Sequence, residues 1–163
     1  MCNVQSKKNI PIWLIAISIL LPTSFSALAT TATNVAIPHI SGYFAATADE
    51  AKWIVTSYMV ANAYMIMLSG WLEHLLGRKQ FMKICILIFT LGAFICTISS
   101  SLNMMVLVRL IQGIGGGAMT PMAQTVLLPV FPDNKKGLAM SLFGFAVMVC
   151  AILGPSFGGF LVD

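Results

Sequence analysis

The chain has 163 residues, of which 58% are hydrophobic and 9% are charged, and its mean hydropathy is +0.92. Soluble domains carry roughly 25% charged residues, so these values exclude an ordinary soluble domain and predict an integral membrane protein. The net charge of +4 does not indicate nucleic-acid binding, because the basic residues lie between apolar runs and do not form one basic tract.

Five apolar stretches are long enough for helices that cross the hydrocarbon core, which takes about 20 residues. They are Ile12–Ile37, Trp53–Leu76, Phe81–Ser99, Met104–Val130 and Leu138–Val162. In the first connection, Pro38–Lys52, Thr47 and Glu50 have the capping-box spacing that begins a helix. Pro38 is expected to interrupt or bend the helix before it. The sequence thus predicts an all-α integral membrane fold with about five transmembrane helices.

The first stretch becomes polar in its second half, within the segment ALATTATNVAIPHI. Lys7 and Lys8, an apolar run and the A-x-A arrangement that ends at Ala29 are also the parts of a secretory signal. One long transmembrane helix is the other interpretation, and the placement of basic residues along the chain favours it. On that helix Thr30, Thr33 and Asn34 share one face by their three- and four-residue spacing.

Basic residues gather on one side of this topology. They are Lys7, Lys8, Arg78, Lys79, Lys83, Lys135 and Lys136. The other side offers only Lys52. By the positive-inside rule, residues 1–11 form a cytoplasmic tail and the C-terminus lies outside.

Arg109, the remaining basic residue, stands about six residues inside the fourth stretch, or roughly 9 Å from its outer end by helical rise. Snorkelling to the interface is one explanation. Gln112 lies on the same face, and the run GIGGGA (113–118) follows, which favours a face packed against protein or water. An intramembrane cation so placed is a functional-site hypothesis. The glycines partly match a dinucleotide-binding fingerprint, but no strand precedes them, and they are expected to let helices approach closely.

The segment GWLEHLLGRKQF leads from the second stretch into a tight turn. Gly70 and Gly77 are seven residues apart and are expected on nearly one helical face. Glu73 is expected to pair with a base, while Arg78 and Lys79 can reach helix-end carbonyls or lipid phosphates. Its basic residues alone are typical of an ordinary cytoplasmic turn under the positive-inside rule. The two glycines support the alternative that the turn has a functional role.

The fifth stretch contains LGPSFGGF. Pro155 removes a backbone donor, and Gly154, Gly158 and Gly159 remove side chains from one region of the helix. Both features predict a helix that bends or packs tightly on a neighbour.

Catalytic patterns are missing from the sequence. His39 is placed near the outer face and His74 near the inner one, so no Ser/His/Asp or Cys/His arrangement shares a membrane depth. The cysteines show no paired spacing, and free thiols are expected. They are Cys2, Cys85, Cys96 and Cys150. The sequence predicts neither an enzyme nor a metal or cofactor site.

Taken in order, four motifs resemble the major facilitator superfamily, and specifically its drug:proton antiporters with fourteen spans, the EmrB/QacA-like branch. NVAIPHISGYF resembles the signature that closes helix one, and GWLEHLLGRK the loop motif between helices two and three. VRLIQGIGGGAMTP resembles the helix-four motif and LGPSFGGFL the antiporter motif of helix five. The resemblance implies that residues 12–163 form part of the N-terminal half of that fold, with helix six and the C-terminal half absent.

The resemblance also implies roles for individual residues. It implies that Arg109 and Gln112 take part in proton coupling. It implies that Thr30, Thr33 and Asn34 line the substrate pathway. The gating and helix-packing set is Gly70, Glu73, Gly77, Arg78, Lys79, Gly113, Gly154, Pro155, Gly158 and Gly159. The implied function is multidrug efflux from a bacterial inner membrane, in which lipophilic, often cationic drugs exchange for protons. Relatives in two-membrane bacteria work with a periplasmic adaptor and an outer-membrane channel.

Two departures from the family pattern affect this expectation. The helix-one signature normally carries an aspartate where this chain has Ala29, and the loop motif usually has an acid where this chain has His74. A membrane-embedded carboxylate is the group best suited to bind and release a proton. Five helices also lack an opposing half, so the chain alone is expected to be inactive. The alternative is a non-transporting membrane protein that binds or regulates full-length relatives.

Overall fold

The computed structural model describes residues 12–162. Its helices are α1 (Ile12–Tyr43), α2 (Ala48–Leu76), α3 (Arg78–Thr97), α4 (Leu102–Val130), the short 3-10 helix η1 (Asp133–Lys135) and α5 (Lys136–Val162). The five long helices and the lack of strands in this range confirm the predicted all-α fold. The predicted tail, residues 1–11 with Cys2, Lys7 and Lys8, lies outside the described residues.

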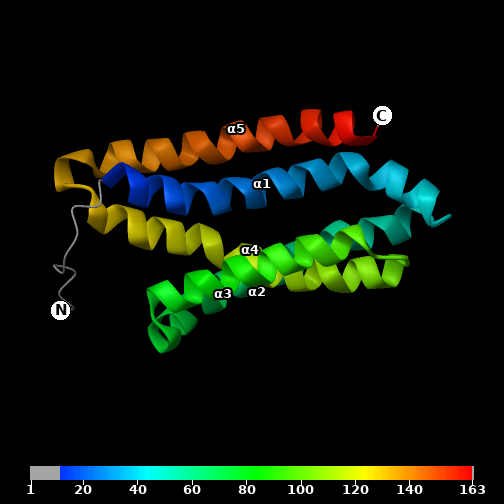
Figure 1. Ribbon diagram of the computed structural model, residues 1–163, viewed down its shortest axis with the longest axis horizontal. Helices are drawn as coiled ribbons and strands as arrows, with labels where there is room; N and C mark the ends of the chain where they lie inside the picture. The colour runs from blue at the N-terminus through cyan, green and yellow to red at the C-terminus, as the bar shows by residue number, and fades with distance from the viewer. Residues whose placement is uncertain (1–11, 163) are drawn as a thin grey trace.

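The helices lie along one long axis in two groups (Figure 1). In one group α5 packs along α1, and in the other α2 and α3 pack on α4. One apolar cluster joins the groups at the end where α1 begins. It consists of Ala16, Ile19, Ala123, Leu127, Phe131, Ala139 and Phe143. A second cluster lies within the α2–α3–α4 group and consists of Met65, Phe81, Cys85, Ala118, Met119 and Met122.

α1 continues through Pro38 to Tyr43, so the prediction that a connection starts at Pro38 was wrong. A proline removes one backbone donor, which long transmembrane helices can tolerate. Beyond Pro38 the hydrogen bonding continues: Ser41 Oγ donates to the carbonyl of Pro38 at 2.8 Å, and the backbone N–H of Phe44 donates to the carbonyl of Ile40 at 3.1 Å. The connection between α1 and α2 is therefore only residues 44–47.

The capping box that begins α2 is confirmed. The N–H of Glu50 donates to Thr47 Oγ1 at 3.3 Å, and the N–H of Thr47 donates to Glu50 Oε2 at 2.8 Å. The Thr47 hydroxyl also donates to Glu50 Oε2, at 2.8 Å. The two bonds that Thr47 donates to this carboxylate hold the pKa of Glu50 below its usual range. Because the cap lies at Thr47, α2 begins at Ala48, before the predicted apolar stretch.

The turn between α2 and α3 consists of Gly77 alone, which has φ of +76°. This left-handed backbone region favours glycine. Gly70 lies within α2, and Gly77 is the C-cap residue, whose N–H donates to the carbonyl of Glu73 at 3.0 Å. The positive φ of Gly77 turns the chain away from the helical path directly after this residue.

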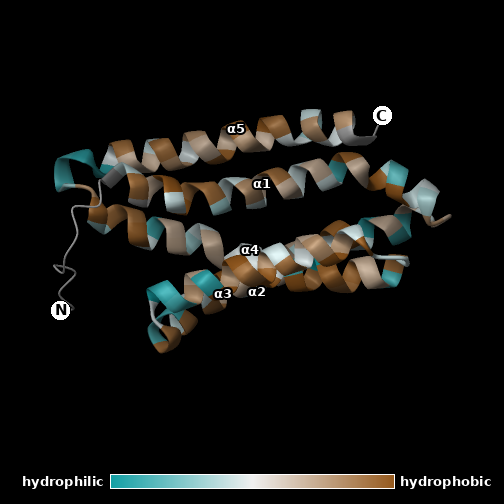
Figure 2. Ribbon diagram, viewed as in Figure 1, coloured by the Kyte–Doolittle hydropathy of each residue, from teal (hydrophilic) through white to brown (hydrophobic). Residues whose placement is uncertain are grey.

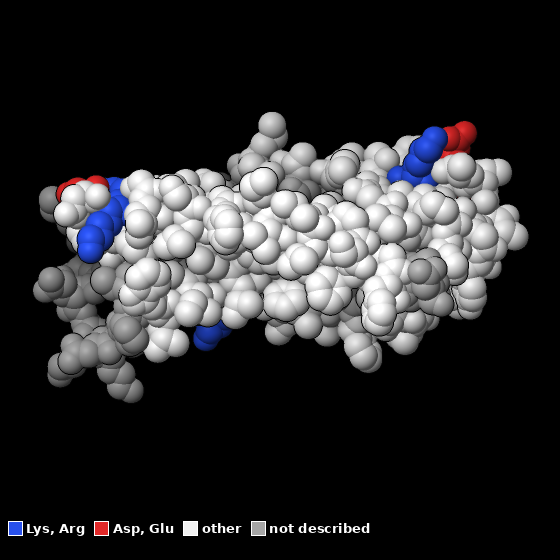
Figure 3. Space-filling model, turned by 90° about the horizontal axis from the view of Figure 1, so that it is seen from above, with Lys and Arg blue, Asp and Glu red and all other residues white. Residues whose placement is uncertain are grey.

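Hydrophobic residues make up most of the length of the helices (Figure 2). On the face drawn in Figure 3, most charged side chains lie towards the two ends. One further basic group shows at the lower edge, left of centre, and the rest of the long middle is uncharged. Among the described residues, four helices are long and apolar enough to cross a membrane, and α2 is not one of them. Tyr58, Asn62 and Tyr64 make α2 more polar, although it has the same length as α4 and packs on it.

Candidate functional site

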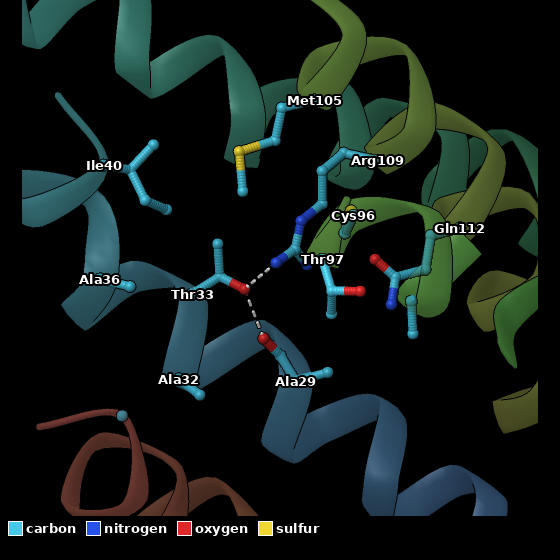
Figure 4. Close-up of a pocket in the computed structure, with 12 residues that line it drawn as sticks. Ala29, Ala32, Thr33, Ala36, Ile40, Cys96, Thr97, Met105, Arg109 and Gln112 are labelled. Atoms are coloured by element: carbon cyan, nitrogen blue, oxygen red, sulfur yellow. Dashed lines mark hydrogen bonds between the residues drawn. The ribbon is translucent and has the colours of Figure 1, made fainter. Parts of the chain in front are cut away.

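A cavity of about 360 Å³ lies where α1, α3, α4 and α5 meet. Its α1 wall consists of small side chains, Ala29, Ala32 and Ala36, together with Thr33. Arg109 of α4 projects toward this wall (Figure 4). Small residues on α1 therefore leave room, and a long cationic side chain from α4 occupies part of it.

Arg109 is anchored by a neutral hydroxyl. Its Nη2 donates to Thr33 Oγ1, and Thr33 Oγ1 donates in turn to the carbonyl of Ala29 at 2.7 Å (Figure 4). The Nε of Arg109 is buried without a hydrogen-bond partner, and so is Oε1 of Gln112, whose side chain is only 3% exposed. A buried polar atom without a hydrogen-bond partner costs free energy. The Nε–H of Arg109 can therefore still donate, and Oε1 of Gln112 can still accept, a hydrogen bond from a bound molecule.

No carboxylate from residues 12–162 reaches Arg109. The acidic residues of this range lie at helix ends. They are Asp49, Glu50, Glu73 and Asp133. Three of them pair with a base on the same short segment: Asp49 with Lys52, Glu73 with Arg78 and Asp133 with Lys136. The charge of Arg109 thus stays uncompensated in an apolar setting, where charges interact most strongly.

The predicted polar face of α1 divides in the structure. Thr33 is 6% exposed and lies in the cavity with Arg109. Thr30 Oγ1 donates to the carbonyl of Ser26 at 2.9 Å, and Asn34 is exposed. Neither Thr30 nor Asn34 lines the cavity. Of the three predicted pathway residues, the structure brings only Thr33 together with Arg109 and Gln112.

The glycines of α4 allow neighbouring backbones to touch it. A Cβ on Gly113 would stand 2.6 Å from the carbonyl oxygen of Tyr58, and one on Gly115 would stand 2.7 Å from that of Cys85. A Cβ on Gly117 would stand 2.8 Å from the Cα of Asn62. α2 and α3 therefore approach α4 on two sides, which is the close packing expected from the sequence.

The glycines of α5 act in the same way toward α1. A Cβ on Gly154 would stand 2.8 Å from the Cβ of Thr31, and one on Gly158 would stand 2.9 Å from the carbonyl oxygen of Ala32. Gly159 has open space around it, and Pro155 is exposed. Only the spacing Gly154–Gly158 is therefore used for contact with α1.

The turn motif forms a separate site at the end of α2. Arg78 Nε donates to Glu73 Oε1 at 2.6 Å, so the base that pairs with Glu73 lies in the same turn. Lys79 is exposed, and Gly70 has no heavy atom near its missing side chain. These residues share no contact with the Arg109 cavity, which they do not line.

Several cavity residues escaped the sequence analysis. Cys96 and Thr97 of α3 and Met105 of α4 line the cavity. Outside the cavity, a buried hydrogen bond between α1 and α2 was also missed: Ser26 Oγ lies 3.0 Å from the hydroxyl of Tyr58. Such contacts depend on how distant helices meet. The small residues Ala29, Ala32 and Ala36 did carry a signal, because their spacing leaves one face of α1 without bulk.

This arrangement of polar groups inside an apolar helix bundle is typical of membrane transport proteins, whose intramembrane charges mark substrate or ion pathways. The Major Facilitator Superfamily model matches residues 19–163. The chain therefore belongs to the Major Facilitator Superfamily, a family of multi-pass membrane transport proteins.

Individual relatives agree with this assignment. The chain is 37% identical over 150 residues to the multidrug export protein EmrB of Escherichia coli, covering 92% of this chain and 29% of the relative. It is 34% identical over 152 residues to the probable multidrug resistance protein EmrY of the same species, covering 93% and 30%. The fatty acid resistance protein FarB of Neisseria gonorrhoeae is 32% identical over 147 residues, covering 90% and 29%. The chain thus spans about 30% of the length of these curated relatives.

Proposed function

We propose that this chain supplies the first helices of a multidrug efflux transporter of the bacterial inner membrane, with its coupling site at the Arg109 cavity. The names of the relatives support the substrate class, since two of the three refer to multidrug export or resistance. The observation that carries the location of the site is the bond from Arg109 on α4 to Thr33 on α1. It joins the two groups of helices at a cavity with unpartnered polar atoms.

The proposed orientation places the N-terminus in the cytoplasm. Arg78, Lys79 and Lys83 follow the α2–α3 turn, and Lys135 and Lys136 lie between α4 and α5. Both turns lie at the end of the bundle where α1 begins (Figure 1). Lys52 alone lies near the opposite turn, between α1 and α2. The positive-inside rule favours the richer end as cytoplasmic.

Transport in this fold requires two bundles that rock around a site near the membrane midplane. In the proposal, α1, α4 and α5 contribute one wall of that site. The guanidinium of Arg109 would stabilise an anionic group that enters the cavity, and would favour the ionised form of a carboxyl beside it. A proton could then be exchanged for substrate at that carboxyl.

Ala29 lines the cavity at the position where the family signature has an aspartate. A methyl group does not titrate, and the described residues place no other carboxylate beside Arg109. The proposal therefore includes a missing group. With alanine at position 29, the cavity has the positive charge of Arg109, which can attract an anion, but no carboxyl that could bind and release a proton.

The proposal is tested with a chimera in which this chain replaces the aligned segment of the Escherichia coli EmrB protein. The chimera and its Ala29→Asp variant are expressed in a pump-deficient strain, and ethidium accumulation is measured. The Ala29→Asp chimera should lower accumulation more than the parent chimera. Asn34→Asp is the matched control, because it adds an acid on α1 at an exposed position outside the cavity. If all of them reach the membrane at equal levels and none lowers accumulation, the transport proposal is wrong.

A further inference from the structure

A second cleft lies far from the Arg109 cavity, between α1, α3 and α4. Its volume is about 570 Å³. Ile19 of α1, Met82 of α3 and Val126 and Pro129 of α4 form apolar walls. Its lining residues on α3 and α4 come from the first turns of α3 and the last turns of α4. These turns lie at the end of the bundle where α1 begins (Figure 1). Its position between the two groups of helices makes it a place where a bound molecule would contact both.

The cleft also carries three basic side chains, Arg78, Lys79 and Lys83. Arg78 is paired with Glu73 at 2.6 Å. Lys79 and Lys83 are exposed, and neither has an ion-pair partner among residues 12–162. One opening therefore offers an apolar interior together with two uncompensated positive charges.

This combination selects among possible occupants. An apolar transmembrane helix in the cleft would cover the walls but would leave the two lysine charges without a partner. A phospholipid with an anionic head group matches both parts, because its phosphate can lie against the ammonium groups while an acyl chain fills the cleft. Basic pockets between transmembrane helices at the cytoplasmic side are suited to such head groups. The charges at this end of the bundle also fit the level of the membrane interface.

We propose that the cleft binds an anionic phospholipid, with its phosphate at Lys79 and Lys83 and an acyl chain against Met82 and Val126. The bound lipid contacts α1, α3 and α4 together, so it stabilises the arrangement of the two helix groups. This site is separate from the Arg109 cavity and does not depend on drug transport.

The test uses the purified 163-residue chain, freed of lipid in detergent and titrated with dioleoyl-phosphatidylglycerol or dioleoyl-phosphatidylcholine, with binding followed by native mass spectrometry. The parent chain should bind phosphatidylglycerol more tightly. The double variant Lys79→Gln/Lys83→Gln should weaken phosphatidylglycerol binding about 10- to 30-fold and leave phosphatidylcholine binding within about twofold, as expected for two lysines near anionic lipid.

Lys135→Gln/Lys136→Gln is the matched control, because it removes two basic charges from the same end of the bundle without touching the cleft. It should leave phosphatidylglycerol binding within about twofold of the parent. Pro129→Trp, at an exposed position on the wall, should narrow the cleft and weaken binding with all charges kept. Equal affinity of the parent for both lipids would overturn the proposal. Equal weakening by the two double variants would also overturn it, since it would reveal general surface attraction. So would unchanged binding in Pro129→Trp.

Discussion

The α1–α5 pair joins the first and last helices of the chain, and the α2–α3–α4 group comes from its middle. Both are packed in the same way. In each, glycines let one helix rest against the backbone of its neighbour: Gly154 and Gly158 against α1, and Gly113 and Gly117 against α2. Between the groups the contacts change character. An apolar cluster joins them at one end, while Arg109–Thr33 and Ser26–Tyr58 join them by hydrogen bonds. The groups are tightly packed inside and are linked in part by polar contacts, where the cavity lies.

This difference indicates where change can occur. Where two helix backbones are in contact, an added atom can be accommodated only if a whole helix shifts, because the interior is close-packed. A hydrogen bond between side chains can be exchanged for a bond to a ligand at small cost. This contrast is why the proposed response to a ligand or a proton is assigned to the boundary between the groups.

The largest loss of stability is expected for Gly117→Ala. The added methyl would meet the backbone of Asn62, which cannot move aside as a flexible side chain would. Overpacking of this kind costs about 3 kcal/mol in free energy of unfolding. The measurement is unfolding of the chain by SDS titration from mild detergent, followed by circular dichroism. Gly144→Ala, in α5 with open space around it, is the control and should lose nothing.

Gly158→Ala should have a smaller effect in the same assay, about 1–2 kcal/mol, because its methyl would meet the carbonyl oxygen of Ala32 at 2.9 Å. Gly159→Ala is the matched control on the adjacent residue, where no heavy atom lies within 4 Å. Equal destabilisation by both variants would show that α5 does not rest on α1 through Gly158.

Thr33→Val should cost about 1 kcal/mol, since it removes the hydroxyl that Arg109 bonds and hydrogen bonds in membrane proteins are individually modest. Thr30→Val serves as the control, because the Thr30 hydroxyl bonds only the carbonyl of Ser26 within its own helix. The difference between the two variants measures the bond across the boundary. Indistinguishable unfolding curves would argue against an anchoring role for Thr33.

Local signals in the sequence predicted much of this fold. Long apolar stretches predicted the helices, and the spacing of Thr47 and Glu50 predicted the start of α2 because a capping box depends on neighbouring residues alone. Pro38 does not interrupt α1, which continues to Tyr43. The sequence did not show that α2 ends at Gly77, because the positive φ of this glycine depends on the turn that it forms.

The site was predicted in part. Arg109 and Gln112 stood out because polar residues are rare inside an apolar stretch. The sequence predicted Thr30, Thr33 and Asn34 as one pathway-lining face but no contact between that face and Arg109, since helical spacing does not show which of the three faces α4. The contribution of Cys96 from α3 had no signal, because it depends on the packing of α3 against α4.

We propose that the Arg109 cavity couples protons to transport once Ala29 is replaced by an acid. The direct measurement is ethidium-dependent proton flux in everted membrane vesicles that contain the EmrB chimera. The Ala29→Asp chimera should show flux, and adding Arg109→Gln to it should abolish that flux at equal protein level. Equal flux in the chimera with Ala29 intact, or undiminished flux after Arg109→Gln, would contradict the account.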